Sequence, residues 1–120
     1  MQNYRRLAVW RKAHAIALNI HRLTENIPKR RCAGLVSQLQ RAALSIPANI
    51  AEGASRATDK DFAKFLQIAL ASTTEVEYHL EFAADAAIIS HSEFLLRQQE
   101  IVEVRRMLTG LVKHVRQANR

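Results

Sequence analysis

The residues that most often carry out chemistry, His, Cys, Asp and Glu, are not spaced in this chain as they are in known metal sites. Glu75 and His79 lie four residues apart, which places both on one face of a helix. A di-iron helical bundle needs Glu-x-x-His pairs on two facing helices, and the chain contains no such pair. We therefore expect His79 to be neutral or exposed to water. The other histidines are not spaced from one another as metal ligands are. They are His14, His21, His91 and His114.

Nucleophilic and phosphate-binding motifs are missing as well. Cys32 is the only cysteine, so the sequence permits no internal disulfide and no cysteine-based zinc site. A lone cysteine fits a reducing compartment and is expected to behave as a small apolar residue. Three glycines cannot build a glycine-rich phosphate loop. These observations predict a protein that is not an enzyme and that has no cofactor and no metal.

One polar row stands out within an apolar segment. Its members are separated by three or four residues, which places them along one helix face: Gln38, Arg41, Ser45, Asn49 and Glu52. An ordinary solvent-exposed face is one interpretation. The other is a subunit interface in which hydrogen bonds fix the register, because Asn and Ser are poor helix-interior residues without partners.

The charge is unevenly distributed. The chain of 120 residues has 18 Lys and Arg against 11 Asp and Glu, a net charge of +7. Residues 1–56 carry +8, residues 57–104 carry −6, and residues 105–120 carry five basic residues and no acid. Segments of opposite sign can pair within or between subunits, or the basic parts can bind a polyanion. The candidates for contacts with nucleic-acid phosphates are Arg11, Lys12, Lys29, Arg30, Arg31, Arg41, Arg56, Arg105 and Arg106.

Four amphipathic helices must position these residues. Apolar residues at three- and four-residue steps predict helices over about 6–27, 35–52 and 58–87, and a fourth that begins at Ser90. Pro28 should end the first helix, leaving Lys29–Arg31 in a loop that Gly34 closes. Gly53 should stop the second. Thr58 and Ser90 each precede an acid by three residues, as capping boxes do.

Pro47 falls inside the second helical pattern. Because the apolar period continues through it without a change of phase, we predict one helix kinked at Pro47 rather than two helices. Short connections favour an antiparallel up-down-up-down four-helix bundle, all-α, with residues 1–120 forming a single domain. No run is long and apolar enough to span a bilayer, and no secretory signal precedes the first helix. We expect a cytoplasmic protein without membrane contact.

The sequence resembles a known family in two stretches above all. They are Val9–Ala13 and Gly34–Gly53, and within the second the string Ser45–Gly53 is highly specific. Supporting matches lie at Phe62, Phe65–Leu66, Ile68–Ser72, Glu75–Glu77 and Arg105–Leu111. On these residues the chain is similar to the four-helix-bundle proteins encoded by intervening sequences in bacterial large-subunit ribosomal RNA genes. It departs from that family at Gln40, where members often have Arg, and at Ala8, where an acid is common.

The resemblance implies a homopentameric bundle with a long second helix through Pro47. It also implies kinship with the accessory proteins of diversity-generating retroelements, which bind nucleic acid and a reverse transcriptase through a basic surface. We therefore predict a homo-oligomer that binds RNA or DNA through its basic surfaces without reading the base sequence. The alternative is an oligomeric scaffold or adaptor that binds a protein partner, suggested by the polar row and the acidic third helix.

Overall fold

The computed structural model describes residues 2–118, apart from the side chain of Lys29, and this part of the chain is all-helical. A short 3₁₀ turn, η1 (Tyr4–Arg6), precedes four long helices that pack as a bundle of about 49 × 21 × 19 Å. The four helices are α1 (Ala8–Glu25), α2 (Lys29–Ala54), α3 (Asp59–Asp85) and α4 (His91–Ala118). The prediction of an all-α four-helix bundle is confirmed.

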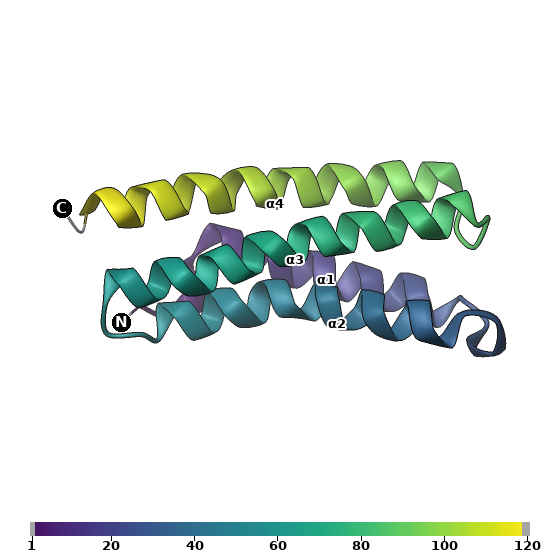
Figure 1. Cartoon of the computed structure of the whole chain (residues 1–120), viewed down its shortest axis with the longest axis horizontal. Coiled ribbons are helices and arrows are strands. Elements are labelled where there is room, and N and C mark those ends of the chain that lie inside the picture. The colour runs from purple at the N-terminus through teal and green to yellow at the C-terminus, as the bar shows by residue number, and fades with distance from the viewer. Residues whose placement is uncertain (1, 119–120) are drawn as a thin grey trace.

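The connections between helices alternate between the two ends of the bundle (Figure 1). The α1–α2 and α3–α4 connections lie at one end, and the α2–α3 connection lies at the other end together with both termini. Helix α3 packs against α2 and α4, and α1 packs against the same two helices. Within the described part of the chain, α1 and α3 do not pack against each other. The two helices therefore occupy diagonal positions.

All four helices contribute to one apolar core. The largest side chains with no exposed surface are aliphatic, and they recur at the predicted three- and four-residue steps. They include Ile20, Leu39, Ile46, Ile50, Leu66, Leu80, Ile101 and Leu108. Cys32 is also buried within this core, as expected of a small apolar residue.

The predicted loop over Lys29–Arg31 is wrong. These residues form the first turn of α2, in which the Arg31 N–H donates to the carbonyl of Pro28 at 3.1 Å. Pro28 ends α1 as expected, but its restricted φ also suits the position just before a helix. The helical path is interrupted at Cys32 (φ −145°, ψ 32°), and Gly34 lies inside the helix instead of closing a loop.

Helix α2 runs through Pro47 as a single element. Cys32 is the one residue described inside this helix with non-helical backbone angles, so the chain does not break at Pro47 into two helices. The kink at Pro47 stays a prediction. Gly53 is buried within the last turn rather than marking the stop, since the helix continues to Ala54.

Gly53 instead permits α2 and α3 to approach closely. A Cβ atom at this position would lie 2.8 Å from the Cβ of Phe65 and 2.9 Å from Cδ1 of Phe62.

Side-chain caps start the two following helices, α3 and α4. The Thr58 hydroxyl accepts the Asp61 N–H at 3.2 Å, and the Ser90 hydroxyl accepts the Glu93 N–H at 3.0 Å. Both predicted helix starts are thereby confirmed.

Candidate nucleic-acid interface

Basic side chains gather where the start of α3 meets the end of α4. A groove of about 580 Å³ between these segments is lined by Lys60, Lys64 and Arg116. A second groove adjoins it, because Gln67 and Arg116 line both, and Lys113 lines this second groove as well. A third groove adjoins it through Lys64 and is also lined by Arg56. We call Arg56, Lys60, Lys64, Lys113 and Arg116 the basic end surface.

The side chains of the basic end surface are exposed and mostly uncompensated. Asp59 and Asp61 are the acids that line the same three grooves. Within residues 2–118, the four cations other than Arg56 form no ion pair shorter than 4.0 Å. Arg56 pairs with Glu52 at 2.5 Å and stacks over the Phe65 ring, 4.8 Å from its centre. A polyanion that crosses this end would meet five cations and three carboxylates, those of Asp59, Asp61 and the Arg56 partner Glu52.

Sequence reasoning identified one member of this surface, Arg56, and missed the other four. Lys60 and Lys64 were hidden because they lie in the segment of net negative charge. Lys113 and Arg116 were counted in the basic tail without being placed on a site. The available signal was helical phase: Lys60 and Lys64 are four residues apart and Lys113 and Arg116 three apart, so each pair shares a helix face.

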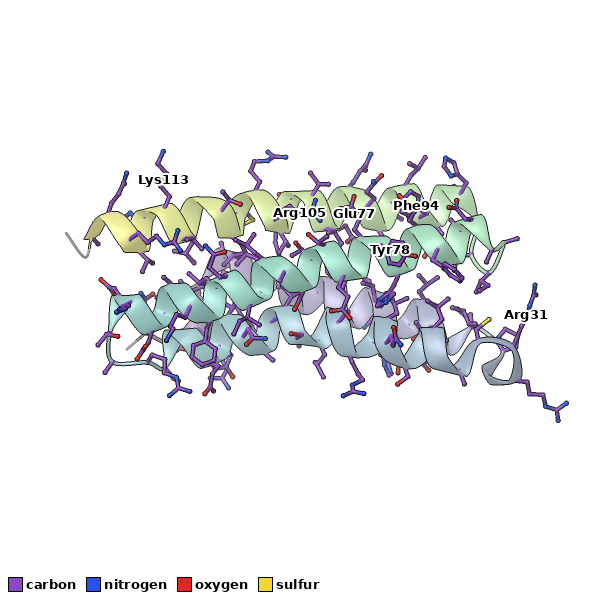
Figure 2. All side chains as sticks on the ribbon, viewed as in Figure 1. Arg31, Glu77, Tyr78, Phe94, Arg105 and Lys113 are labelled. Carbon is purple, nitrogen blue, oxygen red and sulfur yellow. The ribbon has the colours of Figure 1, made fainter. Side chains whose placement is uncertain are left out.

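The structure does not bring the predicted phosphate contacts together. Arg30 and Arg31 are exposed at the opposite end of the bundle, where Arg31 projects beyond the helices (Figure 2). Lys29 has its side chain outside the described residues. Arg41 is exposed at a groove between α1 and α2. Arg11 is exposed near the N-terminus, where it donates to the carbonyl of Arg5 at 3.0 Å.

Two of the residues predicted to contact phosphates, Arg105 and Lys12, instead form ion pairs within the chain. Arg105 is about 31% exposed, and its guanidinium donates to Glu77 Oε1 at 2.7 Å and to the Thr73 hydroxyl at 3.1 Å. Figure 2 shows Arg105 and Glu77 meeting between α3 and α4. Lys12 pairs with Glu103 at 2.5 Å and so links α1 to α4. Arg106 is exposed on the same helix as Glu103.

The carboxylates in these pairs titrate below their ordinary range. A hydrogen bond from Gln98 at 2.9 Å lowers the pKa of Glu77, and the hydrogen bond and charge of Arg105 lower it further against the opposing effect of burial. The hydrogen bond and charge of Lys12 lower the pKa of Glu103. Both carboxylates are therefore ionised near neutral pH and hold their cations in place.

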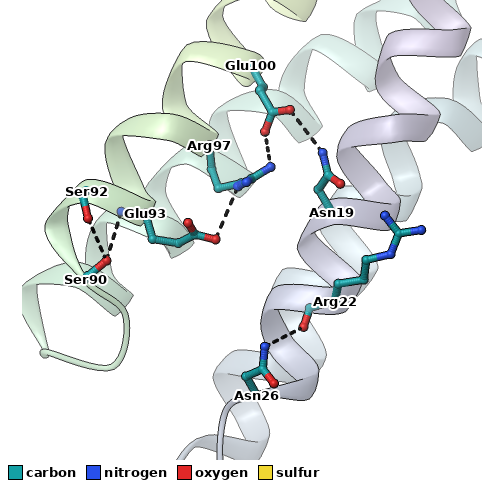
Figure 3. A network of polar contacts seen from close by, with 8 residues as sticks. All are labelled: Asn19, Arg22, Asn26, Ser90, Ser92, Glu93, Arg97 and Glu100. Carbon is teal, nitrogen blue, oxygen red and sulfur yellow. Dashed lines mark hydrogen bonds and ion pairs between the residues drawn. The ribbon is translucent and has the colours of Figure 1, made fainter.

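Two further acids of the negative segment, both on α4, have partners in the same chain, and one of these contacts reaches α1 (Figure 3). Glu100 accepts from Arg97 at 2.5 Å and from the Asn19 amide of α1 at 3.2 Å. Glu93 lies 3.6 Å from Arg97 Nε, an ion pair too long to be a hydrogen bond. Four of the nine acids of this segment are thus paired within the chain, and none of these four lines the basic end surface.

The polar row of α2 divides into inward and outward members. The Ser45 and Ser72 hydroxyls are 2.8 Å apart, and the Asn49 amide donates to Ser45 Oγ at 2.9 Å, so these side chains join α2 to α3 of the same chain. Gln38, Arg41 and Glu52 are exposed. Gln40, where relatives often have Arg, donates to the Thr24 hydroxyl at 2.8 Å and so links α2 to α1.

The residues considered for metal chemistry remain apart. Over the described residues no three or more His, Cys, Asp and Glu side chains are placed to hold a metal ion. Of the two alternatives expected for His79, exposure to water is wrong: the side chain is buried at 9% exposure, and its Nδ1 has no hydrogen-bond partner among the described residues. It lies on the part of α3 that packs in the bundle rather than on the outer face. Among the helices of the described residues, none has the length and apolar character needed to cross a membrane.

The fold and this surface define a helical bundle joined by polar contacts between helices and basic at one end. Comparison with protein families gives a match to the 23S rRNA-intervening sequence protein over residues 5–110, and the chain belongs to that family. A solved structure from Bacteroides thetaiotaomicron, described as a protein of unknown function from the S23 ribosomal protein family, is similar. It is 26% identical, covers 88% of this chain and 99% of its own, and superposes with a TM-score of 0.82. A comparison with curated proteins finds no match.

Proposed function

We propose that this protein is a non-enzymatic, homo-oligomeric bundle that binds RNA or DNA through its basic surfaces without reading base sequence. The basic end surface is the observation that carries the proposal. Its five cations line adjoining grooves at one end of the bundle, and the side chains of four of them are unpaired within the described residues. The single buried cysteine is consistent with action in the reducing cytoplasm.

The geometry favours contacts with phosphates over contacts with bases. Lysine and arginine side chains that project from helix surfaces can neutralise phosphates and release counterions, and this gives affinity without sequence information. Gln67 is the amide that lines two of the grooves, and the apolar Ala63 and Val115 line the largest. An oligomer would repeat this surface once for each subunit.

A salt series on the intact protein tests the proposal. A structured RNA and a DNA duplex of matched length are titrated at several salt concentrations, and binding is followed by fluorescence anisotropy. We expect both to bind at low salt, with affinities that fall steeply and in parallel as salt is added. Undetectable binding at low salt, or an affinity indifferent to salt, would exclude the proposal.

A second candidate function is that of an oligomeric scaffold or adaptor for a protein partner. The observation that favours it is a set of exposed apolar residues on α4: Leu95, Leu96 and Val102. Leu95 and Val102 are seven residues apart and share a helix face. Pull-down from nuclease-treated extract separates the two functions, since a protein retained by the wild type and lost from the Leu95→Glu/Leu96→Glu variant supports the adaptor.

A further inference from the structure

The second half of α3 exposes a face that is both apolar and acidic. Tyr78 is 59% exposed and Phe82 49% exposed, although both are large rings. Glu75 precedes Tyr78 by three residues, and Glu81 and Asp85 follow each ring by three, so all five lie along one side of the helix. We call Glu75, Tyr78, Glu81, Phe82 and Asp85 the acidic stripe.

The carboxylates of the acidic stripe differ from the other acids of the same segment. Glu77, Glu93, Glu100 and Glu103 are bound by cations or amides of the same chain. Glu75, Glu81 and Asp85 have no ion-pair partner in the portion of the chain that the structure describes. The stripe thus combines two exposed aromatic rings with three uncompensated negative charges, which makes it unsuitable for binding a polyanion.

A complementary surface lies between α1 and α2. This α1–α2 groove, of about 480 Å³, is lined by His14, Ala17, Leu18, His21, Gln40, Arg41 and Leu44. Leu44 is 64% exposed and Leu18 41% exposed. The groove therefore offers apolar surface edged by one cation and by two imidazoles, and it has no carboxylate in its lining.

We infer that the acidic stripe of one copy docks into the α1–α2 groove of a second copy. The inference rests on the homo-oligomer proposed above and names the surfaces that form its interface. Tyr78 and Phe82 bury apolar area against Leu18 and Leu44, while the carboxylates face Arg41. Exposed apolar surface edged by charge is typical of protein interfaces, and charge complementarity selects the partner.

The positions of the two surfaces make the contact heterologous. The stripe belongs to α3 and the groove to α1 and α2, and α1 and α3 are diagonal in the bundle. Each copy thus presents both surfaces on different sides, and pairing a stripe with another stripe would bring six carboxylates together. A head-to-tail contact closes into a ring or extends into a filament. Neither surface includes a cation of the basic end surface, so assembly leaves that surface available.

Two interface variants test the pairing by complementation. The groove variant is Leu18→Glu/Leu44→Glu and the stripe variant is Tyr78→Glu/Phe82→Glu, all at exposed positions. The Leu95→Glu/Leu96→Glu variant carries the same charge change on α4. Light scattering gives the mass and circular dichroism the helicity of each. We expect each interface variant to be a helical monomer and the α4 variant to retain the wild-type mass.

Mixing the two interface variants distinguishes a heterologous contact from every other arrangement. The groove variant retains an intact stripe and the stripe variant an intact groove, so an equimolar mixture should form a one-to-one dimer and nothing larger. Wild-type mass in either variant alone, or a mixture that stays monomeric, would overturn the inference. A wild-type protein that is monomeric at high concentration would contradict the homo-oligomer in the proposed function, and the inferred interface with it.

Discussion

The two ends of the bundle are built differently. At the end with the α2–α3 connection, the helices approach closely because Gly53 has no side chain, and five cations line adjoining grooves. At the end with the α1–α2 and α3–α4 connections, the backbone departs from helical geometry at Cys32 and takes a positive φ of 58° at Ala87. Arg30 and Arg31 are exposed at this second end.

The difference shows that a run of basic residues in the sequence does not by itself form a broad basic surface on the folded protein. Lys29–Arg31 is the densest cationic run in the sequence, yet it occupies a single turn at the tip of the bundle. The basic end surface draws its members from the α2–α3 connection, the start of α3 and the end of α4, so residues about fifty positions apart in sequence meet there. Grooves between helices let several cations reach the same phosphate chain, and this is what a polyanion requires.

The largest expected effect separates the two ends by their affinity for RNA. The Lys60→Glu/Lys64→Glu/Arg116→Glu variant should bind structured RNA about a thousandfold more weakly, since each charged hydrogen bond lost costs roughly 1.5 kcal/mol. The Arg30→Glu/Arg31→Glu variant should weaken binding of all sequences alike, by less than about tenfold. Fluorescence anisotropy at fixed salt measures both. Equal losses in the two variants would contradict the comparison.

The second effect concerns helix packing and uses a glycine from each end. Gly53→Ala places a Cβ atom 2.8 Å from Phe65 Cβ, so it should lower the free energy of unfolding by about 2 kcal/mol through overpacking. Gly34→Ala meets no atom within 4 Å and should raise it by about 0.5 kcal/mol, because alanine favours the helix. Urea unfolding measures both changes. A Gly53→Ala variant with an unchanged free energy of unfolding would show that α2 and α3 are less tightly packed at this position.

The third effect is a gain in stability at the second end. Ala87 has a left-handed backbone conformation that costs a non-glycine residue about 1 kcal/mol. Ala87→Gly should therefore raise the midpoint of thermal unfolding by several degrees. The neighbouring Ala86→Gly, at a φ of −83°, serves as the control and should give no gain. A loss of stability in Ala87→Gly would show that the turn does not require this conformation.

The smallest effect lies between the two ends, where α3 and α4 meet. The lowered pKa of Glu77 means that its ionised form is favoured in the folded state. Its stabilisation is complete above the ordinary value of 4.5 and is lost as the pH falls through the lowered pKa. Glu77→Gln should therefore cost about 1 kcal/mol at pH 7 and progressively less as the pH falls below the ordinary value of 4.5.

Urea unfolding of the wild type and of Glu77→Gln at several pH values measures this dependence. Glu75→Gln, on the same helix but exposed, is the matched control. With both substitutions made in the Leu18→Glu/Leu44→Glu background, which removes the inferred interface, Glu75→Gln should change the free energy of unfolding by less than about 0.5 kcal/mol at every pH. A difference between wild type and Glu77→Gln that stays constant as the pH falls to 3 would mean that the ionised carboxylate stabilises the fold no more than its protonated form does.

The helices could be predicted from the sequence because apolar periodicity and the Thr58 and Ser90 caps are local signals. The first turn of α2 could not, since Pro28 and Gly34 predict a loop as readily as the start of a helix. The candidate site was harder to predict than the helices. Arg105 and Lys12 have the composition of phosphate contacts, but their partners Glu77 and Glu103 come from other helices. Only the packed bundle shows which cations are already paired.

The salt dependence of RNA binding tests the central claim, that the basic end surface contacts phosphates, most directly. The Lys60→Gln/Lys64→Gln/Lys113→Gln/Arg116→Gln variant removes four charges without adding any. If all four contact phosphates, the slope of log affinity against log salt should become shallower by about 3 units. The Arg30→Gln/Arg31→Gln variant should keep nearly the wild-type slope. A wild-type slope in the first variant, or the larger loss of slope in the second, would contradict the account.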